Sequence, residues 1–253
     1  MFRLIKRKGF TIIELLVVLV IISIILLAIL RLFQFILNSF DKEYKKLVSQ
    51  LEFISAIELL RVDLNHAGYG IAKDLNINVF DWNSSNKILT IRSSINITNR
   101  KTRGWLLIDC RNSKFKVEID NREEKLSNQD LIFTDINKNF IANGKYGKCP
   151  DFSIMIAFPV DKNHTFCNGQ YCYEIKYKFV KPKSKTCKNG NYRLIRSVNK
   201  SNGETVINCI KNPHVNIDHT NKKIYISMDV LETEDKNNPI WQTVKLVVKP
   251  INW

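Results

Sequence analysis

Residues 10–30 form the longest hydrophobic run of the chain. Within this run only Thr11, Glu14 and Ser23 are polar. A helix of this length is about 31 Å long, which is roughly the hydrocarbon thickness of a bilayer. The run therefore predicts a transmembrane helix rather than the buried helix of a soluble domain.

A cluster of positive charge precedes the run and predicts its orientation. By the positive-inside rule, this charge keeps the N-terminus in the cytoplasm and sends the C-terminal part of the chain out. A secretory signal peptide would have a shorter apolar core, followed by a small-x-small cleavage site, and residues 27–31 offer no such site. The cations are Arg3, Lys6, Arg7 and Lys8.

The helical pattern continues beyond the membrane run, over residues 31–68. Apolar residues recur three and four positions apart, which is typical of an amphipathic helix with a near-heptad face. No Pro or Gly lies between Phe10 and Gly68, and Gly68 tolerates the left-handed conformation that ends many helices. We expect one continuous helix of about 85 Å whose second half packs under a sheet, with a free-standing coiled coil as the alternative. The apolar positions are Phe33, Leu37, Phe40, Tyr44, Leu47, Leu51 and Ile54, continued by Ile57, Leu60 and Leu64.

After Gly70 the pattern changes to short apolar runs between clusters of Asn, Gly, Asp and Lys. Several runs alternate apolar and polar residues, as residues 173–179 do, and this alternation is typical of strands with one solvated face. The predicted fold is α+β, with a long N-terminal helix packed on a largely antiparallel β-sheet. The candidate strands are Ile88–Ile91, Trp105–Ile108, Phe115–Ile119, Leu131–Thr134, Ser153–Phe158, Tyr173–Val180, Tyr192–Val198, Thr205–Ile210, Lys223–Val230 and Val244–Val248.

The chain is strongly basic. It has 39 Lys and Arg against 24 Asp and Glu in 253 residues, and loss of the first nine residues with their four cations would lower the net charge from +15 to +11. The length beyond the helix leaves room for one globular domain of ordinary size. The charge favours approach to anionic surfaces such as phospholipid, envelope polymers or DNA, although scattered lysines are also typical of an ordinary solvated surface.

Six cysteines lie beyond the membrane run. An even number confined to the exported part predicts disulfides formed in an oxidising compartment. There is no Cys-x2-Cys pair, so the spacings do not fit a zinc site. Fifteen pairings are open, and the turn residues between Cys167 and Cys172 favour that pair. The candidates are Cys110, Cys149, Cys167, Cys172, Cys187 and Cys209.

The start of the hydrophobic run has a specific motif. Residues 8–16 read Lys-Gly-Phe-Thr-Ile-Ile-Glu-Leu-Leu, and Glu14 is a lone carboxylate at the fifth position of the run. This arrangement resembles the class III leader of bacterial type IV pilins and pseudopilins. The resemblance implies cleavage between Gly9 and Phe10 by a prepilin peptidase, N-methylation of the Phe10 amine, and a role for Glu14 in assembly. A plain uncleaved signal anchor is the alternative, but an anchor gives no reason for a carboxylate within the span.

The resemblance also implies a pilin-like layout. Residues 1–9 would be the prepilin leader, residues 10–30 the transmembrane helix and residues 31–68 its amphipathic continuation. Residues 69–253 would be an exported, disulfide-containing, β-rich pilin domain.

Three further segments narrow the resemblance to PilW-type minor pilins and J-type minor pseudopilins. Residues 61–70, with Asp-Leu followed by Ala-Gly-Tyr, are similar to the helix exit of these proteins. Residues 175–179 and 192–196 are similar to their strand with Tyr and the Leu-x-Arg strand that follows.

Catalytic and metal motifs are weak. The sequence has no Gly-x-Ser-x-Gly, P-loop, His-Glu-x-x-His or dinucleotide fingerprint, so we predict no enzyme, no metal and no cofactor. Residues 135–139 begin like a calcium loop, but Phe140 replaces the required Gly and Tyr146 the bidentate Glu. His66 is expected to cap the last carbonyls of the helix.

Three function hypotheses follow. The first is a structural minor pilin that primes or caps a type IV pilus, and the second is a minor pseudopilin at the tip of a type II secretion pseudopilus. The third is a basic tip subunit that binds DNA or another anionic surface. All three place the protein in the inner membrane as a single-pass protein and then in a filament. The implied partners are a prepilin peptidase, other major and minor pilins or pseudopilins, an inner-membrane assembly platform and the membrane.

Overall fold

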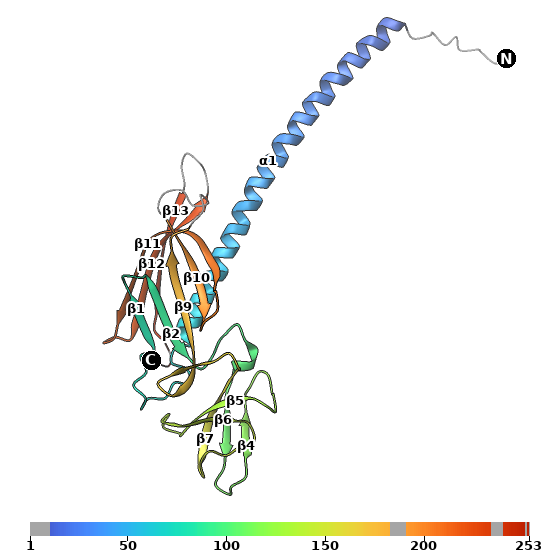
Figure 1. The fold of residues 1–253 in the computed structure, drawn as a ribbon. Helices are drawn as coiled ribbons and strands as arrows, with labels where there is room; N and C mark the ends of the chain where they lie inside the picture. The colour runs from blue at the N-terminus through green and yellow to red at the C-terminus, as the bar shows by residue number, and fades with distance from the viewer. Residues whose placement is uncertain (1–10, 183–190, 234–239, 251, 253) are drawn as a thin grey trace, which may run out of the picture. The chain divides into compact units, whose positions relative to one another are not determined.

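The structure, a computed structural model, describes residues 11–182, 191–233, 240–250 and 252. The chain divides into two compact units, Met1–Gln50 and Leu51–Trp253. The described part of the first unit is helical almost throughout. The second unit contains the end of this helix and all of the described strands (Figure 1).

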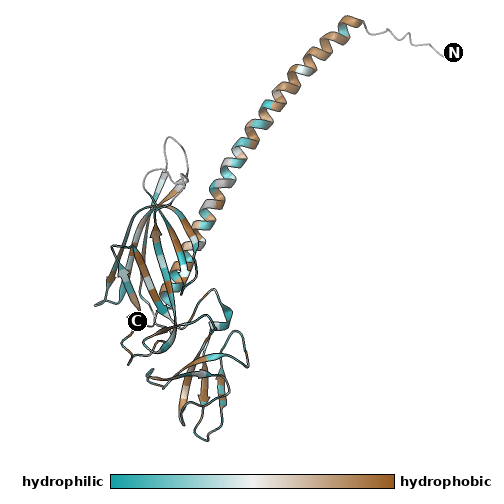
Figure 2. Ribbon diagram, in the orientation of Figure 1, coloured by the Kyte–Doolittle hydropathy of each residue, from teal (hydrophilic) through white to brown (hydrophobic). Residues whose placement is uncertain are grey.

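One helix, α1 (Ile12–Asn65), is long and apolar enough to cross a membrane. Every Ile, Leu and Val between Ile12 and Leu30 is exposed, and Figure 2 shows the hydrophobic residues concentrated in the N-terminal part of the helix. The helix ends just before Gly68, whose φ of 73° lies in the left-handed region. His66 Nδ1 donates to the Val62 carbonyl at 2.8 Å, so the predicted cap at the helix end is confirmed.

Only the last turns of α1 belong to the core of the second unit. Ala56, Leu60 and Leu64 are buried there, with Phe53 and Ile57 packed against the same cluster. Leu51 and Ile54, which the near-heptad stripe placed toward the sheet, are exposed, so this part of the prediction is wrong. A heptad stripe drifts by about 20° per seven residues around a straight helix, so it ends on another face after a few turns. The earlier stripe members are exposed as well: Phe33, Leu37, Phe40, Tyr44 and Leu47.

An eight-stranded antiparallel sheet packs on the end of α1. Its strand order is β1-β2-β9-β10-β11-β12-β13, and β8 pairs with β9 off this path. The strands are β1 (Phe80–Asn83), β2 (Ile88–Ser93), β8 (Thr165–Cys167), β9 (Gln170–Val180), β10 (Tyr192–Val198), β11 (Glu204–Asp218), β12 (Lys223–Thr233) and β13 (Ile240–Val248).

Strand β9 shows how the alternating pattern builds this core. Ile175, Tyr177 and Phe179 are buried in the cluster that holds the helix residues, whereas Lys176 and Lys178 between them are partly exposed. Successive side chains of a strand point to opposite faces, so one face of β9 supplies the core and the other is solvated. The alternation in the sequence therefore identifies the buried face correctly.

A second, five-stranded antiparallel sheet is inserted between β2 and β9. Its order is β4-β3-β7-β5-β6, and it has its own core, which includes Leu106, Phe133 and Met155. A short 3-10 helix, η1 (Arg100–Thr102), precedes it. The sequence predicted one sheet, so the second sheet is a finding of the structure. The strands are β3 (Leu106–Asp109), β4 (Lys116–Asp120), β5 (Asp130–Thr134), β6 (Phe140–Lys145) and β7 (Ile154–Val160).

All ten candidate strands are present in the structure, with bounds that differ by a few residues in most cases. The predicted α+β class, a long N-terminal helix with antiparallel sheets, is confirmed. Strands β1, β6 and β8 were not predicted, because each is short or contains residues typical of turns, such as Asn143 and Gly144 in β6. The fold is therefore pilin-like, with an additional sheet.

Candidate processing and assembly site

The predicted cleavage and methylation positions, Gly9 and Phe10, lie outside the described residues. The next residues form the start of α1. Thr11 donates from its backbone N and from its Oγ1 to Oε2 of Glu14, at 2.9 and 3.0 Å, and the Glu14 N donates back to Thr11 Oγ1 at 3.3 Å. This reciprocal arrangement is a capping box, which satisfies backbone donors that the first helical turn leaves unpaired.

The capping role of Glu14 was not predicted from the sequence. The signal was present, because Thr-x-x-Glu ahead of an apolar run is the spacing of a capping box. Both bonds from Thr11 reach the same oxygen, and within the described residues Oε1 of Glu14 has no hydrogen-bond partner. The carboxylate therefore caps its own helix and still has one oxygen open to another group.

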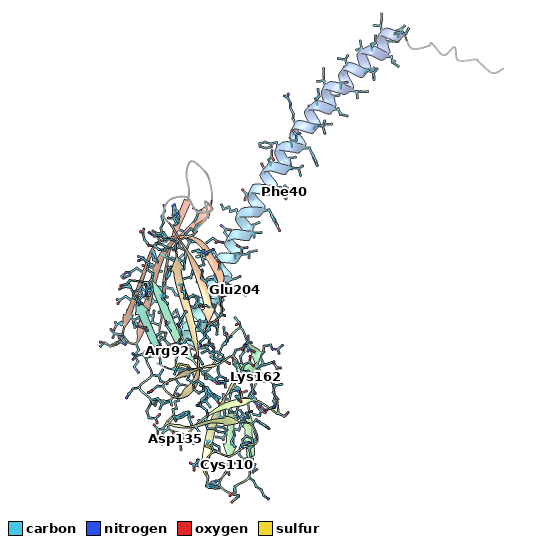
Figure 3. All side chains as sticks on the ribbon, in the orientation of Figure 1. Phe40, Arg92, Cys110, Asp135, Lys162 and Glu204 are labelled. Atoms are coloured by element: carbon cyan, nitrogen blue, oxygen red, sulfur yellow. A yellow bond between two sulfur atoms is a disulfide. The ribbon has the colours of Figure 1, made fainter. Side chains whose placement is uncertain are left out.

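The only other polar residue of the hydrophobic run is satisfied within the helix. Ser23 Oγ donates to the Leu19 carbonyl at 2.8 Å, so this hydroxyl needs no water or partner helix. Further along the same helix, Phe40 is 72% exposed (Figure 3). Glu14 is thus the one residue of the described run with an unused polar atom suited to contact with a charged partner.

In the second unit, the three segments that carried the subtype resemblance meet at one buried cluster. Asp63 comes from the end of α1, Tyr177 from β9 and Arg196 from β10. Asp63 Oδ2 accepts from the Tyr177 hydroxyl at 2.6 Å and from Arg196 Nε at 2.7 Å, and Asp63 Oδ1 accepts from Arg196 Nη2 at 3.2 Å. Arg196 also donates to Asn96 Oδ1 at 3.3 Å. The cluster therefore joins the helix, two strands and the loop that leads into the second sheet.

The three charged or polar side chains of this cluster are buried. Asp63 is 2% exposed, Tyr177 1% and Arg196 8%. Burial and the adjacent Asp63 carboxylate raise the pKa of Tyr177 well above its usual value, so its hydroxyl stays a neutral donor. Burial acts to lower the pKa of Arg196, but its bonds to Asp63 raise it on balance. The pair is hydrogen-bonded on both sides, as a buried charge pair must be to avoid a large desolvation cost.

Two disulfides are present among the described residues. Cys110 is bonded to Cys149 and links the loop after β3 to the segment between β6 and β7. Cys167 is bonded to Cys172, the pair favoured from the sequence, across a turn in which Asn168 and Gly169 have φ values of 46° and 89°. Cys209 is also disulfide-bonded. The remaining candidate, Cys187, lies outside the described residues.

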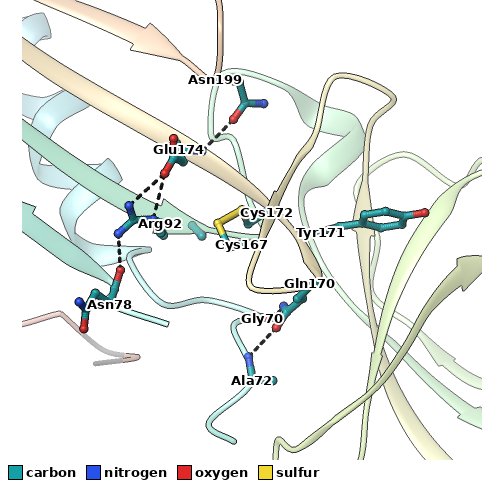
Figure 4. The surroundings of a disulfide bond; sticks show 12 residues. Gly70, Ala72, Asn78, Arg92, Cys167, Gln170, Tyr171, Cys172, Glu174 and Asn199 are labelled. Atoms are coloured by element: carbon teal, nitrogen blue, oxygen red, sulfur yellow. Dashed lines mark hydrogen bonds and ion pairs between the residues drawn. A yellow bond between two sulfur atoms is a disulfide. The ribbon is translucent and has the colours of Figure 1, made fainter. Parts of the chain in front are cut away.

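The hairpin closed by the Cys167–Cys172 bond holds the chain that leaves α1 (Figure 4). The side chain of Gln170 is fully buried, accepts from the Ala72 N at 2.9 Å and donates to the Gly70 carbonyl. Asn168 Nδ2 donates to the Leu75 carbonyl at 2.5 Å. This hairpin therefore fixes the path of residues 70–75 after the helix.

The calcium-like segment is a polar turn closed by its own side chains. The carboxylate of Asp135 accepts from the Asn137 N at 2.8 Å, from the Asn139 N at 2.8 Å and from Asn139 Nδ2 at 2.7 Å. These bonds hold the pKa of Asp135 below its usual value, the largest effect coming from the backbone N–H of Asn139. No group of three or more His, Cys, Asp or Glu residues suited to a metal occurs in the described part of the chain.

Comparison with known families assigns the N-terminal segment. Residues 4–30 match the prokaryotic N-terminal methylation motif. This match covers Gly9, Phe10, Glu14 and three of the four basic residues, Lys6, Arg7 and Lys8. A search of curated proteins and a search of solved structures gave no match.

The motif and the fold agree with each other. The motif is the class III prepilin leader, and it is followed by one long apolar helix whose end packs on an antiparallel sheet. Both features point to a structural protein held in a membrane, processed by a prepilin peptidase and assembled with other pilins. The chain therefore carries the leader motif of type IV pilins and pseudopilins on a pilin-like α+β fold.

Proposed function

We propose that this protein is a minor pilin that is cleaved after Gly9, methylated at Phe10 and placed at the tip of a type IV pilus, where it primes or caps assembly. Residues 1–9 are the leader, residues 10–30 the membrane span and residues 69–253 the exported domain. The N-terminus faces the cytoplasm before assembly, and an inner-membrane platform moves the helix into the filament.

The observation that carries the tip position is the second sheet. The helix exit contacts this insertion directly, because the ring of Tyr69 lies 5.2 Å from that of Phe158 in β7, and the Tyr69 hydroxyl donates to the Gly104 carbonyl at 3.3 Å. The added sheet thus belongs to the C-terminal end of α1. In a filament of side-by-side pilin helices, the second sheet would occupy the space of the next subunit toward the tip. A subunit with this addition suits the first position, which has no subunit ahead of it.

The test is the location of the protein in sheared filaments, together with its N-terminal sequence. We expect immunogold label at one end of the filaments and a mature chain that begins at Phe10. Label distributed along the filaments would contradict the tip position. A chain that begins at Met1 would contradict processing.

The alternative is a minor pseudopilin at the tip of a type II secretion pseudopilus. The leader and the fold support it equally. The genetic neighbourhood separates the two, because a retraction ATPase indicates a pilus, whereas an outer-membrane secretion channel with exported substrates indicates secretion.

A further inference from the structure

Four Asn-x-Ser/Thr tripeptides occur in the exported part of the chain. In exported proteins this tripeptide, without Pro in the middle, is the acceptor for N-linked glycosylation. Transfer of an oligosaccharide to a folded domain also requires that the asparagine be accessible and that its side-chain nitrogen have no hydrogen-bond partner in the protein. The tripeptides begin at Asn83, Asn96, Asn163 and Asn199.

Two of the four asparagines form hydrogen bonds within the fold. Asn96 is half-buried, and its Oδ1 accepts from Arg196 at 3.3 Å and from Thr98 Oγ1 at 2.8 Å. Asn199 is also half-buried, and its Oδ1 accepts from the Glu174 N at 2.8 Å while its Nδ2 donates to the Asn163 carbonyl. Attachment of a glycan to Asn199 Nδ2 would remove its bond to the Asn163 carbonyl, and the bonds to Asn96 Oδ1 hold that half-buried side chain against Arg196.

The other two asparagines are exposed at turns. Asn83 is the last residue of β1, and its Oδ1 accepts from the Asn86 N at 2.9 Å, which holds the following turn. Asn163 lies in the turn between β7 and β8. Within the described part of the chain, neither Asn83 Nδ2 nor the side chain of Asn163 has a hydrogen-bond partner. The nucleophilic nitrogen is therefore accessible at both positions.

A second distinction in the sequence selects the same two sites. The residue two positions before the asparagine is Asp81 or Asp161 at the exposed sites, and Ser94 or Ser197 at the engaged ones. A carboxylate at this position gives the acceptor peptide a charge that a cationic group of a bacterial oligosaccharyltransferase can pair with. Exposure in the structure and charge in the sequence are independent criteria, and they agree.

Asn83 is the better presented of the two sites. Asp81 and Asn83 are two residues apart in β1, so their side chains lie on the same face of the strand. Both are exposed, and β1 is the last strand in the order of the first sheet, so an enzyme can approach these two side chains. At the second site Asp161 is half-buried and accepts from Asn99 Nδ2 at 3.0 Å.

We propose that Asn83 and Asn163 are N-glycosylated after export, with an oligosaccharide linked to polyprenyl diphosphate as the donor. The Asn Nδ2 attacks the anomeric carbon of the first sugar and forms the C–N bond. The bond from that carbon to the diphosphate oxygen breaks, and its electron pair leaves with polyprenyl diphosphate. One amide proton passes to a base of the transferase. The proposal goes beyond the role in a filament and requires only that the domain is exported.

At Asn163 the surroundings also suit a sugar. The rings of His164, Phe166 and Tyr171 contact one another just after the acceptor, with the centroids of Phe166 and Tyr171 5.2 Å apart. Phe166 is 64% exposed, which leaves an apolar ring face next to the turn. The C–H face of a sugar packs well on such a surface, because aromatic faces carry a negative quadrupole.

The experiment uses the full chain in a bacterial host that carries a membrane oligosaccharyltransferase and a lipid-linked oligosaccharide of known mass. We expect two added glycan masses, with loss of one in Asn83→Gln, loss of one in Asn163→Gln and loss of both in the double variant. The matched pair Ser85→Ala and Ser85→Thr keeps Asn83 itself: the Ala variant should lose the first glycan and the Thr variant should retain it. The same host without the transferase is the control.

Oxidised Cys110 and Cys149 in the same sample show that the domain has been exported. An exported chain of unmodified mass, in cells where a reference acceptor protein is modified, overturns the proposal. A peptide map that finds either predicted asparagine unmodified overturns it for that site. Glycan on Asn96 or Asn199 overturns the structural selection.

Discussion

At the scale of single residues, the capping contact of Glu14 can be separated from the assembly role predicted for it. Glu14 caps α1 through Thr11, and it has one oxygen without a partner among the described residues. Cleavage after Gly9 would create a positive amine on Phe10, which is a suitable partner for that oxygen on the same or a neighbouring subunit. An unpaired charge in an apolar packed core is strongly unfavourable, so assembly would depend on both groups being present.

We predict that Glu14→Val is cleaved, inserted and folded but is missing from sheared filaments. Glu14→Gln is the matched control, because its amide oxygen can still accept from Thr11 whereas its charge is lost. If the charge acts in assembly, Gln should fail as Val does, while Thr11→Val should assemble. Immunoblots of sheared and membrane fractions measure this, and normal incorporation of the Gln variant would leave only the capping role.

The Asp63, Tyr177 and Arg196 cluster is the second feature at this scale. Asp63→Leu leaves Arg196 buried without its carboxylate, so we predict a loss of about 3–5 kcal/mol in the free energy of unfolding. Tyr177→Phe should cost about 1.5–3 kcal/mol, the usual range for a hydrogen bond to a charged group. The double variant Asp63→Leu/Arg196→Met should be less destabilised than the sum of the single variants. Additive losses in urea unfolding would contradict coupling between the two residues.

At the scale of elements, the sequence predicted the helix and ten strands because their patterns are local. Tyr173–Val180, for example, alternates so regularly that its buried face could be assigned. The pairing of strands far apart in the chain was not predictable, and neither was the division into two sheets, since period-two alternation does not identify a partner. The prediction from the apolar stripe of the helix was wrong for a different reason. The stripe positions from Phe33 to Ile54 are exposed and are not part of the sheet core.

Contacts between the functional residues were also not predicted from the sequence. Glu14 was recognised from its place in an apolar run, but its bond to Thr11 was missed although the spacing predicts it. Asp63, Tyr177 and Arg196 each lay in a segment that resembled the family, yet only the fold brings them within hydrogen-bond distance. Single segments give residue types, and contacts between them come from the tertiary structure.

The two resolved disulfides should differ in their effect on stability. In the chain-entropy model the contribution grows with the closed loop, and the sequence separations are 39 residues for Cys110–Cys149 and 5 for Cys167–Cys172. We predict that replacing both cysteines by Ala costs about 4 kcal/mol for the first pair and about 2 kcal/mol for the second. Urea unfolding of the two double variants measures the difference, and a larger loss for the second pair would contradict the model.

A half-buried tyrosine at the helix exit, Tyr69, and buried tyrosines on β9 predict alkaline sensitivity. Burial raises the pKa of Tyr69 from 10.0 to about 12, so the folded protein keeps a proton that the unfolded chain loses. The free energy of unfolding should therefore fall as the pH rises from about 10 to about 12. Tyr69→Phe should make this dependence shallower. Urea unfolding at fixed pH values tests it, and an unchanged slope in the variant would contradict the assignment.

At the scale of the whole molecule, the last turns of α1 belong to the exported domain. Leu60 and Leu64 are almost fully buried, and each such side chain contributes about 1.5–3 kcal/mol. Together they amount to a large part of the about 5–15 kcal/mol that stabilises a typical domain. The boundary between the units at Leu51 is consistent with this assignment.

We predict that a fragment beginning at Leu51 is soluble and folded, whereas one beginning at His66 is not. The first keeps Ala56, Leu60 and Leu64, and the second lacks all three. Circular dichroism and cooperative thermal unfolding distinguish the two outcomes. A cooperative transition in the shorter fragment would show that the sheets fold without the helix.

The position of the inserted sheet has a consequence for how the sequence of this protein can vary in evolution. Ser93 and Tyr173 are paired on adjacent strands, so the chain leaves the first sheet and returns to it at a single rung of the ladder. The five-stranded sheet within this segment can therefore vary without altering the register of β2 on β9, provided that the contacts of Asn96 with Arg196 and of Gln170 with residues 70–72 are kept. If the protein acts in a filament as proposed, the inserted sheet could diverge in evolution while the pairing of β2 with β9 stays the same.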